Sequence, residues 1–536
     1  MARNSRHDRT ASTSIRKGVS AIVDDTITPR EAMIDDLFFL RTVLEEAGVE
    51  FLLVHGNDER PVIAVDTADT QVIREALVAA MANEPFMLKF DRKKSGPAVL
   101  VADGLLAIGP DDRAFVLFRA RVAPVGGLTY GASSGVRLEL WEWSDDVVTT
   151  PTESALTRFE IPRSEIEITT VERYGVTWRT IEPMFTRVSS DVPFDIDLVF
   201  SWVDGTDLEF QRARARQMQS YVVGEGDDHE ARFRQLDELR YALRSVHLFA
   251  PWVRRIFVVT DSPQPLWLAD HPKVTFVRSE EFFVDPSVLP THNSQAVESQ
   301  LHHIPGIAEH FLYSNDDMFF GRPVAPSMFF SPGGVTSFIE ATTRIGLGEA
   351  TPERSGFENA ARVNRELLRE RFGVTITNHL EHCAAPLRKS IMAELEQEFH
   401  EDFVRTAASR FRSRTDISVT NSLYHYYALL TGRAVVRTDA KVKYVDTTMR
   451  SGLIQMEKLL QKRSFDMFCL NDGSFPEISA EERAEAVRSF LDGYFPVAAP
   501  WEKPEDSVRP ESAITRGKSA KHLGSGKPAT TSPAQV

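Results

Sequence analysis

The first third of the chain carries helical and strand patterns in mixed order. Apolar residues recur at helical spacing near 34–47 and 70–82, and short strand-like runs occur over 51–54 and 136–141. Helices and strands mixed in this way are typical of α+β domains. No group of polar residues in this region has a catalytic arrangement. The pattern therefore predicts a smaller, accessory α+β domain over residues 29–188, used for packing, binding or assembly.

From about residue 191, compact apolar runs alternate with longer amphipathic segments. The apolar runs predict buried strands over 195–203, 255–260, 274–277 and 311–314. The amphipathic segments predict helices over 233–249, 294–303, 387–399 and 416–430. Strands and helices in alternation are typical of α/β folds, whose ligands bind at the carboxyl edge of the sheet. This second, larger domain is predicted to extend over residues 189–498.

Four parts of the chain carry little regular patterning. A long irregular stretch follows Gly321, and Cys469–Asp472 is interpreted as a turn on a loop. Residues 1–28 are polar and basic, and residues 499–536 are rich in Pro, Ser, Thr, Gly and Lys. Such compositions predict disordered termini.

Charge and cysteine content narrow the function classes. The 536 residues carry 62 Lys and Arg against 77 Asp and Glu, a formal charge of −15, which argues against nucleic acid as a partner. The two cysteines, Cys383 and Cys469, are too few for a disulfide framework and are not spaced like a zinc site. We find neither a signal peptide nor a long apolar run, so we expect no transmembrane segment and a cytoplasmic location, with peripheral contact at the inner membrane face left open.

The strongest candidate for a metal site is the pair Asp316 and Asp317, which follows Asn315 at the end of a predicted strand. Paired carboxylates suit a hard divalent cation such as Mg²⁺, with Mn²⁺ as an alternative, especially beside substrate phosphates. A turn or a helix cap would explain an Asp-Asp pair equally well.

A second group of candidates surrounds the first strand of the larger domain. Asp195 and Asp197 precede or begin this strand, and a structural role is favoured for them. Beyond the strand, Asp204 and Asp207 are better placed for a nucleotide or metal, and Trp202 stacks on a base or fills the core.

Basic residues crowd the part of the chain after the irregular stretch. His382 and His379 precede Arg388 and Lys389, and Arg410, Arg412 and Arg414 lead to Asp416. Guanidinium groups match charge on a phosphoryl leaving group, although an exposed basic face or a structural histidine would give the same pattern.

Taken in order, several segments resemble the conserved blocks of the Stealth family, which includes bacterial capsule and exopolysaccharide phosphotransferases and the animal N-acetylglucosamine-1-phosphotransferase. The first block corresponds to DIDLVFSWVDGTD, and the second contains LDELRYALRSV, APWVRRIFVVTDSPQPLWL and LYSNDDMFFGRPV. The third runs from His382 to about Arg433 and contains LYHYYALL, and the fourth is FCLND at 468–472. Together they span a little over half of the chain, and the predicted N-terminal domain lies outside them.

The resemblance implies a Rossmann-like nucleotide-sugar transferase core with helical insertions, and a Stealth-type phosphotransferase activity. A hexose 1-phosphate would pass from a UDP-sugar donor to a hydroxyl of a polysaccharide acceptor, with release of UMP. The implied catalytic residues are His382, Arg412 and Asp317, and the implied metal ligands are Asp316 and Asp317. Asp204, Gly205, Trp202 and Asn315 would bind the donor, with support from Arg240, Asp416, Asn471 and Asp472.

Two features leave alternatives open. His292 stands where the family often has an aromatic residue, and the pair His379 and His382 leaves open which histidine is catalytic, although the spacing to Arg412 favours His382. A metal-dependent glycosyltransferase and a non-catalytic polysaccharide-binding protein are the alternative functions. The sequence does not indicate the hexose, the acceptor, the oligomeric state or the role of the N-terminal domain.

Overall fold

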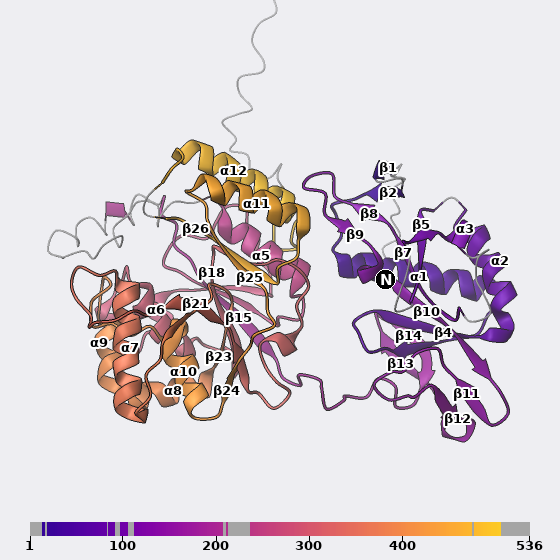
Figure 1. Ribbon diagram of the computed structural model, residues 1–536, viewed down its shortest axis with the longest axis horizontal. Helices are drawn as coiled ribbons and strands as arrows, with labels where there is room; N and C mark the ends of the chain where they lie inside the picture. Colours follow the sequence, from indigo (N-terminus) through magenta and orange to yellow (C-terminus); the bar gives the residue numbers. More distant parts are fainter. Residues whose placement is uncertain are drawn as a thin grey trace, which may run out of the picture.

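The computed structural model describes residues 13–16, 19–82, 84–91, 97–104, 112–206, 211–212, 236–473 and 476–504. Figure 1 shows these residues in two groups of elements, one coloured indigo to purple and the other magenta to yellow, joined by an extended segment. Among the described residues, no sheet contains strands from both groups.

The N-terminal group is an α+β arrangement, as predicted, in which α1 and α2 pack on a mixed sheet. The α1 helix begins at Pro29 because Thr28 and Glu31 form a capping box that satisfies its first backbone donors. Leu37, Leu40 and Leu117 bury the contact between helix and sheet. The elements are β1 (Thr13–Arg16), β2 (Val19–Val23), α1 (Pro29–Glu46), β3 (Phe51–His55), β4 (Pro61–Asp66), α2 (Thr70–Ala80), β5 (Phe86–Phe90), β6 (Val99–Leu100), α3 (Val101–Gly104), β7 (Ala114–Arg119), β8 (Arg121–Val122), β9 (Thr129–Tyr130), β10 (Val136–Trp143), β11 (Val147–Thr149), β12 (Glu160–Pro162), β13 (Ile168–Arg173) and β14 (Val176–Ile181).

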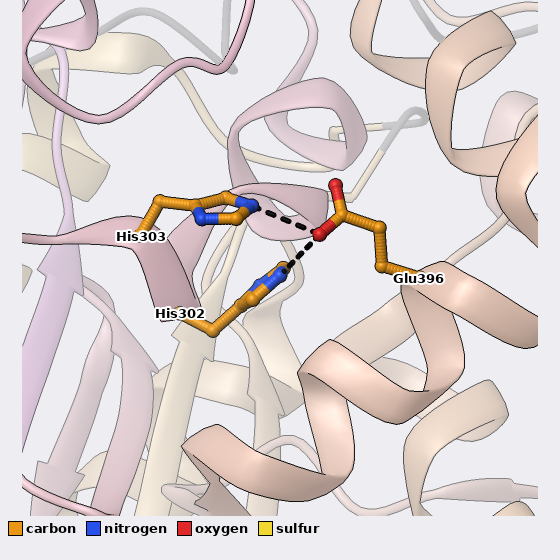
Figure 2. Close-up of side chains that lie close together, drawn as sticks. All are labelled: His302, His303 and Glu396. Carbon is orange, nitrogen blue, oxygen red and sulfur yellow. Dashed lines mark hydrogen bonds and ion pairs between the residues drawn. The ribbon is translucent and has the colours of Figure 1, made fainter.

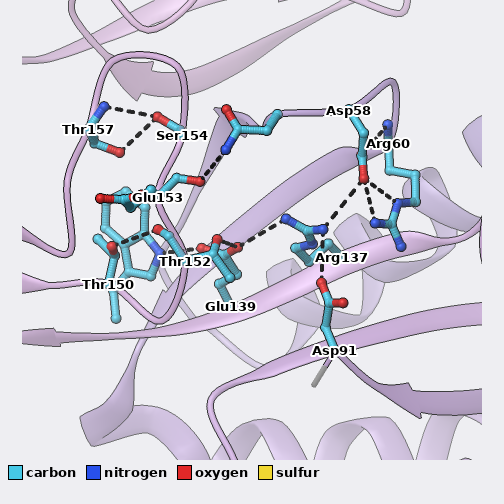
Figure 3. A network of polar contacts seen from close by, with 12 residues as sticks. Asp58, Arg60, Asp91, Arg137, Glu139, Thr150, Thr152, Glu153, Ser154 and Thr157 are labelled. Atoms are coloured by element: carbon cyan, nitrogen blue, oxygen red, sulfur yellow. Dashed lines mark hydrogen bonds and ion pairs between the residues drawn. The ribbon is translucent and has the colours of Figure 1, made fainter. Parts of the chain in front are cut away.

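Charged residues of this group are paired with one another. Arg137 of β10 contacts Asp58 and Asp91 at 3.5 Å and 2.8 Å, and Glu139 of the same strand accepts a hydrogen bond from the indole of Trp141 (Figure 3). Each buried charge in this network therefore has an opposite charge or a hydrogen-bond donor beside it.

The second group is built on a parallel sheet with the strand order β17-β16-β15-β18-β23, in which β23 is antiparallel. This confirms the α/β prediction and gives a Rossmann-like strand order. The elements are β15 (Ile196–Ser201), α5 (Glu238–Phe249), β16 (Ile256–Val259), β17 (Val274–Val277), α6 (Ser294–Ser299), the 3-10 turn η8 (Leu301–His303), β18 (His310–Asn315), β19 (Met318–Phe320), β20 (Thr336–Phe338), β21 (Glu340–Arg344), α7 (Gly356–Phe372), β22 (Asn378–Leu380), β23 (Ala385–Arg388), α8 (Lys389–Glu398), α9 (His400–Ala407), α10 (Tyr424–Leu430), β24 (Ala434–Val436), β25 (Val442–Asp446), α11 (Arg450–Lys462), β26 (Met467–Asn471) and α12 (Ala480–Tyr494).

Both faces of the parallel sheet are buried, which explains its continuous apolar strands. Leu198 and Phe200 of β15 point to the face covered by α5, α11 and α12, whereas Val199 points to the face covered by α6–α10. Successive strand residues alternate between faces, so an apolar run without alternation fits a strand between two helical layers.

A second, small sheet has the strand order β19-β26-β25. Through it, a strand from late in the chain, β26, pairs with β19, which directly follows β18. Met318 is the register partner of Cys469, and Asp446 is the partner of Asn471. The loop predicted for Cys469–Asp472 is therefore wrong as far as Asn471, because Met467–Leu470 is a short buried strand whose apolar character outweighs the turn preference of Asn and Asp.

Several other element predictions need correction. The stretch after Gly321 is not irregular throughout: it contains α7, capped by the hydroxyl of Ser355 and ended by Gly373 at φ 70°. The predicted 294–303 helix ends at Ser299 and continues as η8. Within 416–430, a π-helical turn at Val419–Leu423 precedes α10. The first residues of the predicted 387–399 helix belong to β23.

The packed part of the chain extends beyond the predicted termini. Trp501 is buried, and Glu502 forms ion pairs with Arg240 and Arg244 of α5, so the predicted disordered tail does not begin at residue 499. The strand β2 pairs with β8, so order also begins before residue 28. None of the helices within the described ranges is long and apolar enough to cross a membrane.

Candidate active site

The carboxyl ends of β15 and β18 lie side by side at the point where the strand order reverses. Ser201 and Asn315 are register partners in the two parallel strands, and β16 and β17 lie on the other side of β15. Crevices at such switch points are where open α/β sheets bind ligands. The predicted site residues at Trp202–Gly205 and Asn315–Asp317 therefore lie at or beyond the carboxyl ends of two adjacent strands, as the sequence predicted.

Three carboxyl groups gather at this edge: Asp316, Asp317 and Glu238 of α5. Burial, followed by repulsion from Asp317 and Glu238, raises the pKa of Asp316 well above its usual range. Burial raises the pKa of Asp317 to about 6, despite hydrogen bonds that favour its charged form. Burial raises the pKa of Glu238 to about 7, with a further contribution from Asp317. The site concentrates negative charge that the described residues leave unbalanced.

The surroundings of Asp317 suit a cation. Its Oδ2 atom lies 3.4 Å from both Cys469 Sγ and Asn471 Nδ2, which come from β26. Its Oδ1 atom is buried and has no hydrogen-bond partner among the described residues. A buried carboxylate oxygen without a partner is costly unless a cation or a proton satisfies it. Asp316 and Asp317 therefore have the donor chemistry and the vacant oxygen that a divalent cation requires.

Glu238 is the site residue that the sequence reasoning missed. It is the first residue of α5, it is buried, and it accepts a hydrogen bond from the Leu236 backbone N–H at 2.6 Å. Its charge acts on Asp316. The predicted helix begins at residue 233, so Glu238 lies inside it as an ordinary acidic residue, and the sequence carries no signal that distinguishes it.

Arg412 belongs to a buried polar network that leads to Asn315. Its guanidinium donates to Ser294 Oγ at 2.9 Å, and its charge acts on the carboxylate of Glu298. The Tyr313 hydroxyl lies 3.3 Å from Glu298 Oε1 and 3.0 Å from Asn315 Oδ1. The structure thus connects Arg412 to the end of β18 through α6, although the two are distant in sequence.

Asp416 fixes the loop that carries Arg412. It is fully buried and accepts hydrogen bonds from the Ser413 N–H at 2.7 Å, the Ser409 hydroxyl at 2.7 Å and the Asn293 amide at 2.8 Å. Three residues separate Asp416 from Arg412, and Ser409 and Ser413 lie on either side of Arg412 in the chain, so these bonds fix the loop that carries Arg412.

The two candidate histidines share the ring of Phe357 as a neighbour but differ in their other contacts. His382 packs against the ring of Tyr444, with ring centroids 5.2 Å apart, and burial lowers its pKa. Tyr444 is the register partner of Cys469, which contacts Asp317. His379 stacks on Phe357 at 4.7 Å and faces the positive charge of Arg362. His382 is therefore the histidine that the structure connects to Asp317.

The residues after β15 are held by hydrogen bonds within their own turn and to Ser262. Asp204 accepts hydrogen bonds from the N–H and hydroxyl of Thr206, and its own N–H donates to Ser262. Trp202 is 5 % exposed and packs edge-on against Phe276, so core packing accounts for its position and a donor role stays a prediction. Asp207 lies outside the described residues.

Other candidates lie in ion pairs. Arg254 binds both oxygens of Asp197 at the opposite, amino end of β15, which agrees with the structural role favoured for Asp195 and Asp197. Arg240 binds Glu502 at 2.6 Å. Asp472 pairs with Arg483 and accepts from Thr447, so it holds β25 and β26 beside Asn471.

The chain matches all four conserved regions described for Stealth proteins. Conserved region 1 matches residues 194–221, region 2 residues 232–338, region 3 residues 381–429 and region 4 residues 457–513. These regions contain each predicted site residue, and they occur in the predicted order.

Curated relatives match over nearly the whole chain. Exopolysaccharide phosphotransferase CpsY of Mycobacterium tuberculosis is 58% identical over 503 residues, covering 94% of each chain. An exopolysaccharide phosphotransferase of Nocardia farcinica is 52% identical over 497 residues, covering 92% of each. Together with the site, these matches define an enzyme that transfers phosphorus-containing groups. The chain belongs to the Stealth family.

Solved structures show a more distant likeness. The galactosyltransferase LgtC, in complex with donor and acceptor sugar analogues, aligns with a TM-score of 0.30 and 11% identity, over 58% of this chain and 98% of that one. The bifunctional glycosyltransferase WbbM aligns with a TM-score of 0.29 and 9% identity, over 62% of this chain and 55% of that one.

Proposed function

We propose that the enzyme transfers a hexose 1-phosphate from a UDP-sugar to a hydroxyl of a polysaccharide, forming a phosphodiester and releasing UMP. The observation that carries this proposal is a group of unbalanced carboxylates at the switch point of the sheet, to which a polar network leads from Arg412. A pyrophosphate is the kind of ligand that needs both a divalent cation and a guanidinium. The names of the relatives support the general activity.

Asp316 and Asp317 would hold the cation, Mg²⁺ or Mn²⁺, which would supply positive charge to the pyrophosphate oxygens of the donor. The unpartnered Oδ1 atom of Asp317 is the ligand atom that the structure offers most directly. Glu238 adds negative charge beside them. Asn471 and Asn315 orient the site from β26 and β18.

The reaction requires a proton acceptor and a group that stabilises the leaving phosphate. We assign the first role to His382, because lowering of its pKa leaves the ring neutral and able to accept the acceptor hydroxyl proton near pH 7. The acceptor oxygen forms a bond to the β-phosphorus, and the bond from that phosphorus to the bridging oxygen breaks. UMP leaves with the electron pair, and Arg412 neutralises the charge that develops.

Donor binding is assigned to the residues beyond β15. Asp204 and Gly205 follow the carboxyl end of β15, where Ser201 is the register partner of Asn315, and the donor nucleotide would enter at this edge of the sheet. Because nucleotide sugars are made in the cytoplasm, we place the reaction there, with the polysaccharide acceptor reaching the enzyme from that side. Residues 29–188 are proposed to form an accessory domain.

The test is the identity of the released nucleotide. Purified enzyme is incubated with Mg²⁺, UDP-hexoses and oligosaccharide acceptors, and the products are identified by mass. UMP with a phosphate-bridged product establishes the proposal. UDP would instead show attack at the sugar carbon by a glycosyltransferase, and donor binding without either product would support a binding protein.

A further inference from the structure

A second group of metal-ligating side chains lies away from the carboxylate cluster. The Nε2 atoms of His302 and His303 lie 2.9 Å and 3.0 Å from the same oxygen of Glu396. Figure 2 shows the two imidazoles, from η8, and the carboxylate, from α8, pointing toward a common position. Their ligand atoms all lie within 4.8 Å of one another.

We propose that His302, His303 and Glu396 bind one transition-metal ion of the Zn²⁺ class, with water completing its coordination. Two imidazole nitrogens and one carboxylate oxygen are a ligand set that Zn²⁺ uses when one position stays open. Imidazole ligands favour Zn²⁺ and its neighbours over Mg²⁺, which prefers oxygen. The site is therefore chemically distinct from Asp316 and Asp317.

The spacing of the ligand atoms fits such an ion. Zinc–ligand distances of about 2.0–2.2 Å in a tetrahedral arrangement place neighbouring ligand atoms roughly 3.3–3.5 Å apart. The observed separations from Glu396, 2.9 Å and 3.0 Å, need to widen by only a few tenths of an ångström. His303 and Glu396 are the partly exposed ligands, and a small shift of the Glu396 carboxylate would change both distances.

Burial also fits an ion that keeps one solvent ligand. The His302 side chain is 2% exposed, whereas the side chains of His303 and Glu396 are 32% and 22% exposed. The inner side of the site is thus fixed by packing, and water reaches the ion from the side of His303. This gradient gives an entry path without opening the core.

The place of the site in the fold suggests a structural role. The η8 turn connects α6, which carries Ser294 and Glu298, to β18, which ends at Asn315. At the other end of β18, His310 is the register partner of Arg388. The residue after Arg388, Lys389, begins α8. An ion shared by η8 and α8 would fasten two segments that flank β18, on which Asn315 depends.

The experiment measures metal binding to the full chain after removal of bound metal with a chelator. Zn²⁺ alone is titrated calorimetrically, and Co²⁺ is used as a spectroscopic probe of imidazole coordination. The variants are H303A and E396Q, with H400A as a control at an exposed histidine of the neighbouring α9. D317N removes the principal ligand of the carboxylate site, and circular dichroism confirms that every variant is folded.

We expect one equivalent of Zn²⁺ to bind the wild type, D317N and H400A with the same affinity. H303A and E396Q should weaken this binding at least about 100-fold. Loss of a residue that binds the ion directly costs more than loss of a residue that only hydrogen-bonds to such a ligand. Zn²⁺ should raise the Tm of the wild type and D317N but not of H303A. Absence of Zn²⁺ binding, or equal binding by H303A and E396Q, would overturn the proposal and leave a hydrogen-bonded cluster only.

Discussion

Two clusters of buried carboxylates, one in each group of elements, differ in how their charge is matched. In the N-terminal group, fully buried Asp36 pairs with Arg119 at 2.7 Å and with Arg121 at 3.0 Å. At the edge of the central sheet, Asp316, Asp317 and Glu238 repel one another instead. A carboxylate matched by arginine stabilises the fold, whereas carboxylates without a matching cation cost stability and remain available to a ligand. Whether a buried carboxylate has a matching cation thus distinguishes the structural cluster around Asp36 from the candidate active site.

The largest expected effect tests the unbalanced side of this comparison. Asp317→Asn should lower turnover by about 10⁴-fold or more, because it removes a ligand for the cation and its charge. The free energy of unfolding in urea, without metal, should stay the same or rise, since the variant removes a buried repulsion. Asp195→Asn, on an exposed carboxylate, is the matched control. A large loss of stability in Asp317→Asn would contradict the comparison.

For the arginine-paired carboxylate Asp36, we expect a loss of stability with turnover unchanged. Asp36→Asn leaves Arg119 and Arg121 without their buried partner, so we expect a loss of about 3–5 kcal/mol in the free energy of unfolding. Turnover per folded molecule should be unchanged, because no described site residue contacts Asp36. Urea denaturation and active-site-normalised assays measure the two quantities. Unchanged stability would show that the pairing is not needed to hold the sheet.

Arg412 sharpens the comparison, because it is a cation whose network reaches the site. Arg412→Ala should lower kcat by about 10²–10³-fold with a much smaller change in KM, as expected for a group that acts on developing charge. Arg414→Ala, two residues away and exposed, is the control. Equal losses in kcat and donor affinity would assign Arg412 to ground-state binding.

A smaller effect concerns pH. Because the pKa values of Asp317 and Glu238 are raised to about 6 and about 7, both must lose protons before the cluster holds a cation fully. Mg²⁺ affinity should therefore rise about tenfold or more from pH 5.5 to 7.5. Without metal, the sign reverses: these acids are protonated more readily in the folded state, so stability falls as pH rises from the unfolded pKa values through the folded ones. Calorimetric Mg²⁺ titrations and melting curves across this pH range test both statements. The variant Glu238→Gln should make Mg²⁺ affinity depend less on pH in the upper part of the range, near pH 7.

The sequence predicted the features that depend on local pattern. Apolar runs located β15 and β18, and their carboxyl ends located Asp204 and Asp316, because parallel strands place these ends at one edge. The family resemblance located His382 and Arg412 before any contact was known. These predictions concern positions along the chain and along strands, where sequence is most informative.

Features that depend on distant packing were not predicted. Glu238 joins the cluster because α5 begins beside the end of β18, and no local signal at residues 236–240 indicates this. The strand β26 was taken for a loop because its partners, β19 and β25, lie elsewhere in the chain. The metal-ligating group at His302 depends on α8, about ninety residues later in the sequence. Each case needs a tertiary contact that periodicity does not contain.

The pairing of β19 with β26 also governs when the surroundings of Asp317 are complete. Ser201 and Asn315 emerge from the ribosome well before Asn471, which completes the surroundings of Asp317. At bacterial and eukaryotic synthesis rates of about 5–20 residues per second, the interval between Asn315 and Asn471 is roughly 8–31 s. Throughout this time the parallel strands have been synthesised, but the surroundings of Asp317 are incomplete. The surroundings of Asp317 are therefore complete only after the chain has been made as far as Asn471.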